Sequence, residues 1–125
     1  MKTIKIVCLV FSVVAVLITI IFFSWWAMKD RIVFGGESFN QIRWITAAAT
    51  PEEPCYRGAM AYDLQQHFLV KGMPRQTATV LLGRPTWEDF AEIEYDLGHC
   101  LWDVHGLRLY FDAQDKLVHS RIVQH

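Results

Sequence analysis

Residues 92–111, EIEYDLGHCLWDVHGLRLYF, decide the fold of the soluble part of this chain. Apolar side chains recur at every second position in two runs, Ile93, Tyr95 and Leu97, then Leu107, Leu109 and Phe111. Alternation with a period of two is typical of a strand that buries one face and leaves the other in water. The stretch therefore predicts two half-buried strands.

A third strand follows at Leu117–Val123, after a turn at Asp112–Lys116. Aspartate favours turns because its side chain can bond the nearby backbone. The second and third strands should therefore form a hairpin in an antiparallel sheet. We expect the other sheet face to be in water, and it carries Glu94, Asp96, Arg108 and Arg121.

Two short helices are predicted before the strands. Met60, Leu64 and Phe68 recur every four residues, which indicates one apolar stripe of a helix that ends by Gly72. Pro74 suits the first turn of a second helix, which Gly83 ends. Its expected inner face is Thr77, Val80 and Leu81. Helices segregated from strands give an α+β fold, with two helices on one face of a three-stranded antiparallel sheet.

Several motifs in this region resemble the SmpA/OmlA, or BamE-like, family of small envelope proteins. They are KGMPR at 71–75, VLLGRP at 80–85, YDLG at 95–98, and LYFD at 109–112 followed by KLV at 116–118. The resemblance covers residues 57–122 and implies two helices on a three-stranded sheet. It also implies a protein-binding role in the cell envelope, accessory to outer-membrane protein assembly.

An uncharged apolar block occupies Ile6–Met28, interrupted only by Ser12, Thr19 and Ser24. As a helix these residues would span about 34 Å, enough to cross a bilayer core of about 30 Å. No small-residue cleavage site follows the block, so we expect an uncleaved signal-anchor. Cys8 lies too early in it to be a lipidation site.

The orientation of the anchor rests on its flanks. Lys2 and Lys5 precede the block, and Trp25 and Trp26 at its other end suit a membrane interface. We expect the N-terminus in the cytoplasm and the C-terminal domain in the periplasm, on a bacterial inner membrane. The predicted parts are a tail and transmembrane anchor at 1–28, a linker or stalk at 29–54 and a two-layer domain at 55–125. Within the linker, Ser38 could cap a short helix toward Ala49, with Ile42 and Ile45 on one side.

The distribution of charge argues against a nucleic-acid partner. Lys2 and Lys5 precede the anchor, so the rest of the chain has ten basic residues against thirteen acidic ones. No basic cluster of the kind that binds nucleic acid occurs. Acidic residues gather in 88–103 and basic ones in 57–84, which indicates two faces that attract each other within the fold or a polar docking surface.

Cys55 and Cys100 are the cysteines outside the anchor. In an oxidising compartment they could form a disulfide, and in the cytosol they would be buried thiols. Without a CxxC motif, redox catalysis is not indicated.

The sequence carries no recognisable catalytic or metal-binding motif. The stretch with Asp96, His99, Cys100, Asp103 and His105 has zinc-ligand residue types at spacings that match no known site. The whole sequence contains no GxSxG, Walker or HExxH motif. We therefore expect no enzyme, no cofactor and no small-molecule substrate.

Trp87 and Trp102 flank the acidic strand and are candidate partner contacts, because tryptophan is enriched in interface hot spots. The leading hypothesis is a membrane-anchored periplasmic module that binds another envelope protein. The alternative is an inhibitor or immunity module that neutralises a secreted enzyme.

Overall fold

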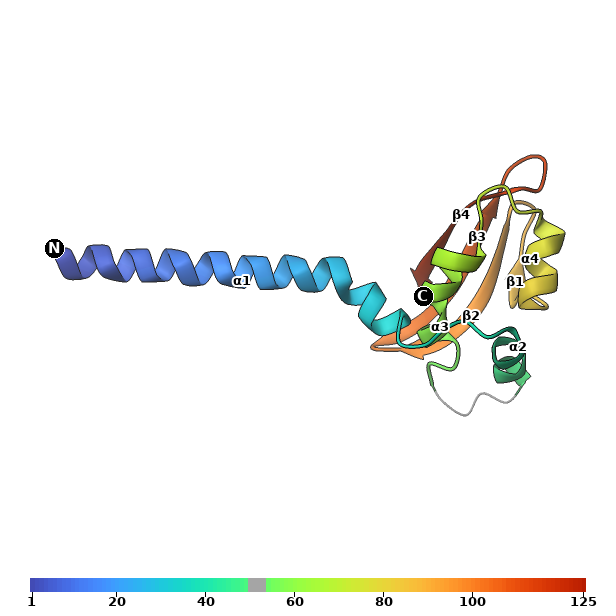
Figure 1. Cartoon of the computed structure of the whole chain (residues 1–125), viewed down its shortest axis with the longest axis horizontal. Coiled ribbons are helices and arrows are strands. Elements are labelled where there is room, and N and C mark those ends of the chain that lie inside the picture. Colours follow the sequence, from blue (N-terminus) through green and yellow to red (C-terminus); the bar gives the residue numbers. More distant parts are fainter. Residues whose placement is uncertain (50–53) are drawn as a thin grey trace. The chain divides into compact units, whose positions relative to one another are not determined.

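The computed structural model describes residues 1–49 and 54–125 of the chain (Figure 1). It forms two compact units, Met1–Asp30 and Arg31–His125, each described here by itself. Residues 50–53, part of the predicted linker, lie outside the described residues.

Among the described residues, one helix is long and apolar enough to cross a membrane: α1, Lys2–Phe34. The apolar side chains of residues 6–28 are exposed around the whole circumference, as in helices whose solvent is lipid. Ser12 Oγ donates to the carbonyl oxygen of Cys8 at 2.9 Å, and Thr19 Oγ1 to that of Ala15 at 2.8 Å. These bonds satisfy the two hydroxyls without water, as a bilayer core requires.

The far end of this apolar helix carries the aromatic pair. Trp25 and Trp26 are both exposed, and Lys29 Nζ lies 3.9 Å from the centroid of the Trp26 ring. The ammonium over the ring places a charge next to an amphipathic side chain, an arrangement suited to a membrane–water boundary.

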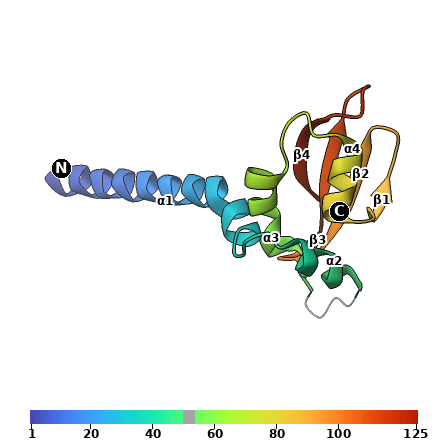
Figure 2. The ribbon, with the colours of Figure 1, turned by 45° about the vertical axis from the view of Figure 1, so that its right-hand side comes forward.

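The sheet of the second unit has four antiparallel strands in the order β1-β2-β3-β4 (Figures 1 and 2). Their bounds are β1 Trp87–Glu88, β2 Glu92–Cys100, β3 Asp103–Phe111 and β4 Leu117–Gln124. The three-stranded prediction was therefore wrong by one strand. β1 was missed because two residues are too few to show an alternation.

The two predicted helices correspond to three elements: α3 Gly58–Asp63, the single π-helical turn η1 Leu64–Phe68, and α4 Arg75–Leu82. Gly72 and Gly83 have positive φ angles of 89° and 83°, which glycine adopts at no steric cost, and both lie where helices end. The inner face of α4 was predicted only in part, because Leu81 packs against the core but Thr77 and Val80 are exposed. Ala78 and Leu82 are its buried residues, whereas Val80 is 69% exposed.

A further helix, α2 (Gln41–Ala49), belongs to the fold, so the predicted number of helices was too low. Asn40 caps it in place of Ser38, because Asn40 Oδ1 accepts a bond from the N–H of Arg43 at 3.0 Å. Its inward residue is Trp44, which is fully buried and donates from Nε1 to the carbonyl oxygen of Leu82 at 3.1 Å. α2 therefore lies beside α4.

The segment predicted as a stalk thus supplies part of the core. Phe34 and Trp44 are buried, and Phe39 packs against the core cluster. Ile42 and Ile45, which the apolar pattern favoured, are exposed. Apolarity alone could not identify the inward face of so short a helix, because the bond from Trp44 to the Leu82 carbonyl oxygen is a contact between residues distant in sequence.

One hydrophobic core joins the helices to the inner sheet face. Its members are Phe34, Trp44, Met60, Ala61, Leu64, Ala78, Leu82, Ile93, Tyr95, Leu97, Cys100, Leu107, Leu109, Phe111 and Leu117. Every inward apolar strand residue predicted from the alternation is in this set.

The outer face is less open to water than predicted. Glu94 is only 8% exposed, and its carboxylate accepts from Arg108 Nε at 3.1 Å and contacts His125 Nε2 at 2.8 Å. The Trp87 ring lies 5.1 Å from the Arg108 guanidinium. Desolvation lowers the pKa of this group, but the charge and hydrogen bond of Glu94, together with the charges of Tyr110 and Glu92, raise it above its ordinary value. Glu94 is covered because its cross-strand neighbours are Trp87 and Arg108.

Candidate functional site

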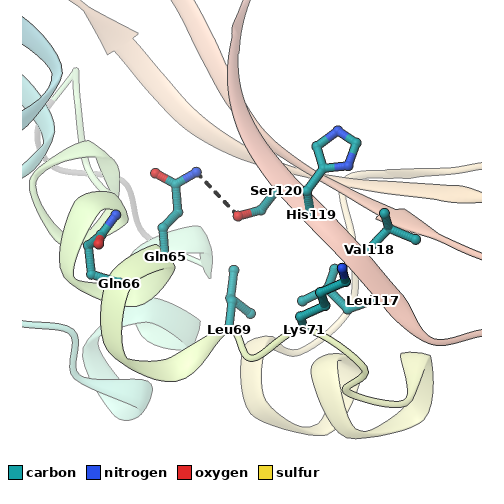
Figure 3. Close-up of a pocket in the computed structure, with 8 residues that line it drawn as sticks. All are labelled: Gln65, Gln66, Leu69, Lys71, Leu117, Val118, His119 and Ser120. Atoms are coloured by element: carbon teal, nitrogen blue, oxygen red, sulfur yellow. Dashed lines mark hydrogen bonds between the residues drawn. The ribbon is translucent and has the colours of Figure 1, made fainter. Parts of the chain in front are cut away.

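A small groove lies between η1 and the first half of β4 (Figure 3). Its volume is about 260 Å³, and it is lined by Gln65, Gln66, Leu69, Lys71, Leu117, Val118, His119 and Ser120. Most of these side chains are polar, whereas pockets for small organic ligands are usually larger and mainly apolar. The groove is therefore better suited to polar main-chain groups than to an apolar molecule.

The π-helical turn sets one wall of the groove. Its main-chain bond runs from the N–H of Leu69 to the carbonyl oxygen of Leu64, at 3.0 Å. Gln65, on this turn, reaches across and donates from Nε2 to Ser120 Oγ at 3.2 Å (Figure 3). Single π-helical turns occur frequently at functional sites.

The opposite wall is β4, which is an edge strand of the sheet. Its first residue is covered, because Gly72 donates to the Leu117 carbonyl oxygen at 2.7 Å and Leu117 donates to that of Met73 at 2.8 Å. The other edge, β1, is only two residues long. β4 is thus the longer edge of this sheet, and long edges are templates for a further strand.

The register shows which main-chain groups of β4 face outward. His125 donates to the carbonyl oxygen of Val104 at 2.9 Å, so this pair is a hydrogen-bonded one. Hydrogen-bonded and non-bonded pairs alternate along an antiparallel ladder. Leu107 pairs with Ile122 and Leu109 with Ser120, which are non-bonded positions in this alternation. Ser120 and Ile122 therefore direct their N–H and C=O groups away from β3, toward the free edge.

The groove and the edge carry positive charge. Lys71 lines the groove, Arg121 is exposed on β4, and β4 itself contains no acidic residue. His119 is held in place because its ring stacks on Tyr110, with 4.4 Å between the centroids. The arrangement can bind an extended polypeptide through its main chain and favours acidic side chains on it.

Beneath α3, Cys55 and Cys100 are joined in a disulfide. Next to it, Tyr56 donates its hydroxyl to Asp96 Oδ2 at 2.7 Å, and burial with this bond raises the tyrosine pKa to about 12. Burial lowers the pKa of Arg57, although a guanidinium stays charged in proteins. These groups connect α3 to β2.

The ligand-type residues of the 96–105 stretch have separate surroundings. Cys100 is in the disulfide, Asp103 accepts from Gln124 Nε2 at 3.1 Å, and the His105 ring packs on Phe34 with 5.3 Å between centroids. Within residues 1–49 and 54–125, no three His, Cys, Asp or Glu side chains are grouped as metal ligands would be.

The two candidate tryptophans do not form one surface. Trp87 is 43% exposed on β1 and pairs with Glu94, whereas Trp102 is 85% exposed in the turn between β2 and β3. Glu94 and Cys100 are six residues apart, which is about 20 Å along a strand. The charged stretches do meet in part, because Arg75 lies 3.8 Å from both Glu88 and Asp115.

The sequence did not predict the groove. Gln65 follows Leu64 of the apolar stripe and carries no motif of its own, and its position beside Ser120 depends on the π-helical turn. One signal for the edge was present in the sequence: the third predicted strand, Leu117–Val123, is the last of a meander, and the last strand of a meander lies at an edge of its sheet.

Comparison with models of known protein families, with curated proteins and with solved structures returned no match.

Proposed function

We propose that this chain is a membrane-anchored protein-binding module that captures an extended segment of another envelope protein by adding it to β4. The observation that carries the proposal is the open edge of β4 next to a polar, basic groove. Main-chain bonds to such an edge provide affinity, and side chains beside it provide specificity.

The membrane placement is supported by α1, whose exposed apolar surface needs lipid around it. For the compartment, we propose the periplasmic side of a bacterial inner membrane. The disulfide between Cys55 and Cys100 favours this side, because disulfides persist in oxidising compartments.

The resemblance to the SmpA/OmlA, or BamE-like, family suggests the kind of partner. The elements α3 with η1, α4, β2, β3 and β4 follow in the order that this family has. We therefore propose that the partner takes part in the assembly or maintenance of the envelope.

A photoreactive benzoylphenylalanine at Gln66, which is exposed in the groove, tests the partner site in the full chain within cell membranes. The decisive variant is Ser120→Pro, because it removes an N–H that faces the free edge and no bond of the β3–β4 ladder. Ser120→Ala is the matched control, since it loses the hydroxyl bonded by Gln65 but keeps the main-chain N–H.

The proposal predicts a discrete adduct with another envelope protein in the Ser120→Ala chain and its loss in the Ser120→Pro chain. An adduct equally strong in both would exclude strand addition at this edge. An adduct with a second copy of the chain would show that the site mediates self-association, and it would contradict the proposal of another envelope protein as the partner.

The compartment has its own test. A phosphatase fused after His125 is active only outside the cytoplasm, and a fluorescent protein that folds only in the cytoplasm is the matched reporter. We expect phosphatase activity and no fluorescence. The reverse result would overturn the periplasmic placement and leave the β4 site untouched.

A further inference from the structure

The turn between β2 and β3 exposes an apolar tip, formed by Leu101, Trp102 and Val104. Their exposed fractions are 53%, 85% and 40%. A single exposed apolar residue needs no explanation. Here a tryptophan that is 85% exposed lies between two further exposed apolar residues, and in water it lacks the stabilisation that burial of its large ring would give.

The backbone holds this tip outward. Leu101 has φ of 59°, a left-handed conformation that is uncommon for residues other than glycine. The nearby carboxylate is turned back into the domain, because Asp103 accepts from the Gln124 side chain and from the N–H of Val104 at 3.0 Å. The Asp103 carboxylate is therefore engaged within the domain and is not directed past the apolar groups of the tip.

The length of chain between the apolar block and the folded unit limits how far the tip can lie from the membrane. Phe34 belongs to the folded unit, is buried, and packs on His105, three residues after Trp102. Phe34 is six positions after Met28, the end of the apolar block. Six positions of chain reach at most about 21 Å when fully extended.

From these observations we infer that the Leu101–Trp102 tip is a second membrane contact, with Trp102 in the headgroup region of the bilayer that α1 crosses. The inference rests on the membrane anchoring by α1, and it holds for either orientation of the chain. Tryptophan is enriched at this depth because its ring is apolar and its N–H can still bond water.

The contact would also orient the partner site. In the β3–β4 ladder, His105 pairs with Gln124 near the tip, whereas Phe111 pairs with Leu117 at the groove. Six residues of strand, about 20 Å, separate these two levels. A tip at the headgroups therefore leaves the groove free for a partner in solution.

Brominated lipids, which quench tryptophan emission on contact, test this in vesicles of phosphatidylcholine. The protein is the full chain with Trp25→Phe and Trp26→Phe, which leaves Trp44, Trp87 and Trp102. We expect bromines near the headgroup to quench the emission, and we expect Trp102→Phe to remove most of that quenching. Trp87→Phe is the control, because Trp87 lies at the other end of β2, and it should retain the quenching.

Quenching that is unchanged by Trp102→Phe would overturn the inference. Vesicle flotation of the same samples reports anchoring by α1 separately, so loss of the tip contact and loss of the anchor give different results. Equal urea midpoints for the Trp102→Phe and parent chains verify that the domain is folded in both.

Discussion

Arg57 donates from Nε to the carbonyl oxygen of Trp44 at 2.9 Å, and its guanidinium lies 4.7 Å from the Trp44 ring. The residue is 3% exposed and also lies 3.5 Å from the carbonyl oxygen of Asp96. One buried side chain thus links α2, α3 and β2. This contact explains how the segment before Cys55 becomes part of the folded unit.

Arg57→Met should destabilise the domain by about 2 kcal/mol, because it leaves buried carbonyl oxygens without a donor and removes the cation over the ring. Urea unfolding of the full chain in detergent, followed by tryptophan emission, measures the loss. Arg43→Met is the control, since Arg43 pairs with Glu37 on the surface and should cost under about 1 kcal/mol. Equal losses for the two variants would contradict the linking role of Arg57.

Replacement of Cys55 and Cys100 by alanine should lower the free energy of unfolding by about 4 kcal/mol, because the bond closes a long loop in the unfolded chain. The sequence separation of the two cysteines is 45 residues. Cys8→Ala is the control and should have no effect, as Cys8 is free and lies in α1. If the urea midpoint of the chain with both cysteines replaced equals that of the parent chain, the disulfide does not stabilise the domain.

Gly58→Ala should destabilise by about 1–3 kcal/mol through overpacking against the disulfide. A Cβ at Gly58 would overlap Cys55 Sγ and lie 2.7 Å from Cys100 Sγ. At Gly36 the nearest atom to an added Cβ is Ala59 Cβ at 4.0 Å, so Gly36→Ala is the matched control. The cost of Gly58→Ala should shrink when both cysteines are alanine, and a cost that did not change would place the clash elsewhere.

Asp63 connects the segment before α2 to α3, because its Oδ2 accepts from the N–H of Phe39 at 2.7 Å. This bond, with a second one from His67, lowers the pKa of Asp63 in the folded state. The stabilisation is therefore complete above the unfolded pKa of about 3.9 and is lost as the pH falls through the lower folded value.

The expected result is that Asp63→Asn makes the stability less dependent on pH below about pH 4, because asparagine does not titrate. Urea midpoints measured across this acid range for the parent and variant chains test it. A variant with the same acid loss as the parent would mean that other carboxylates account for it.

Much of the fold was accessible from local patterns. The alternation around Ile93 and Leu107 identified the sheet and its inner face, and Gly72 and Gly83 marked the ends of the helices. These features depend on residues that are neighbours in the sequence, so the sequence alone is sufficient to predict them.

The features that the sequence did not predict depend on distant contacts. Trp44 is buried because its side chain bonds to Leu82 and its carbonyl oxygen bonds to Arg57. Glu94 is covered because Trp87 and Arg108 lie on the neighbouring strands directly opposite it. For the cysteines, the sequence left the bonded and free states open. The groove needs both the π-helical turn at Gln65 and the edge position of Ser120, which no local pattern contains.

The most direct test of strand addition is hydrogen exchange of the β4 amides, resolved by NMR for the full chain in nanodiscs, before and after the crosslinked partner is added. We predict slower exchange at Ser120 and Ile122, whose N–H groups face the free edge. Arg121, whose N–H faces β3 in the same alternation, should change little. Partner binding with unchanged exchange at Ser120 and Ile122 would contradict the β4 edge as the binding site.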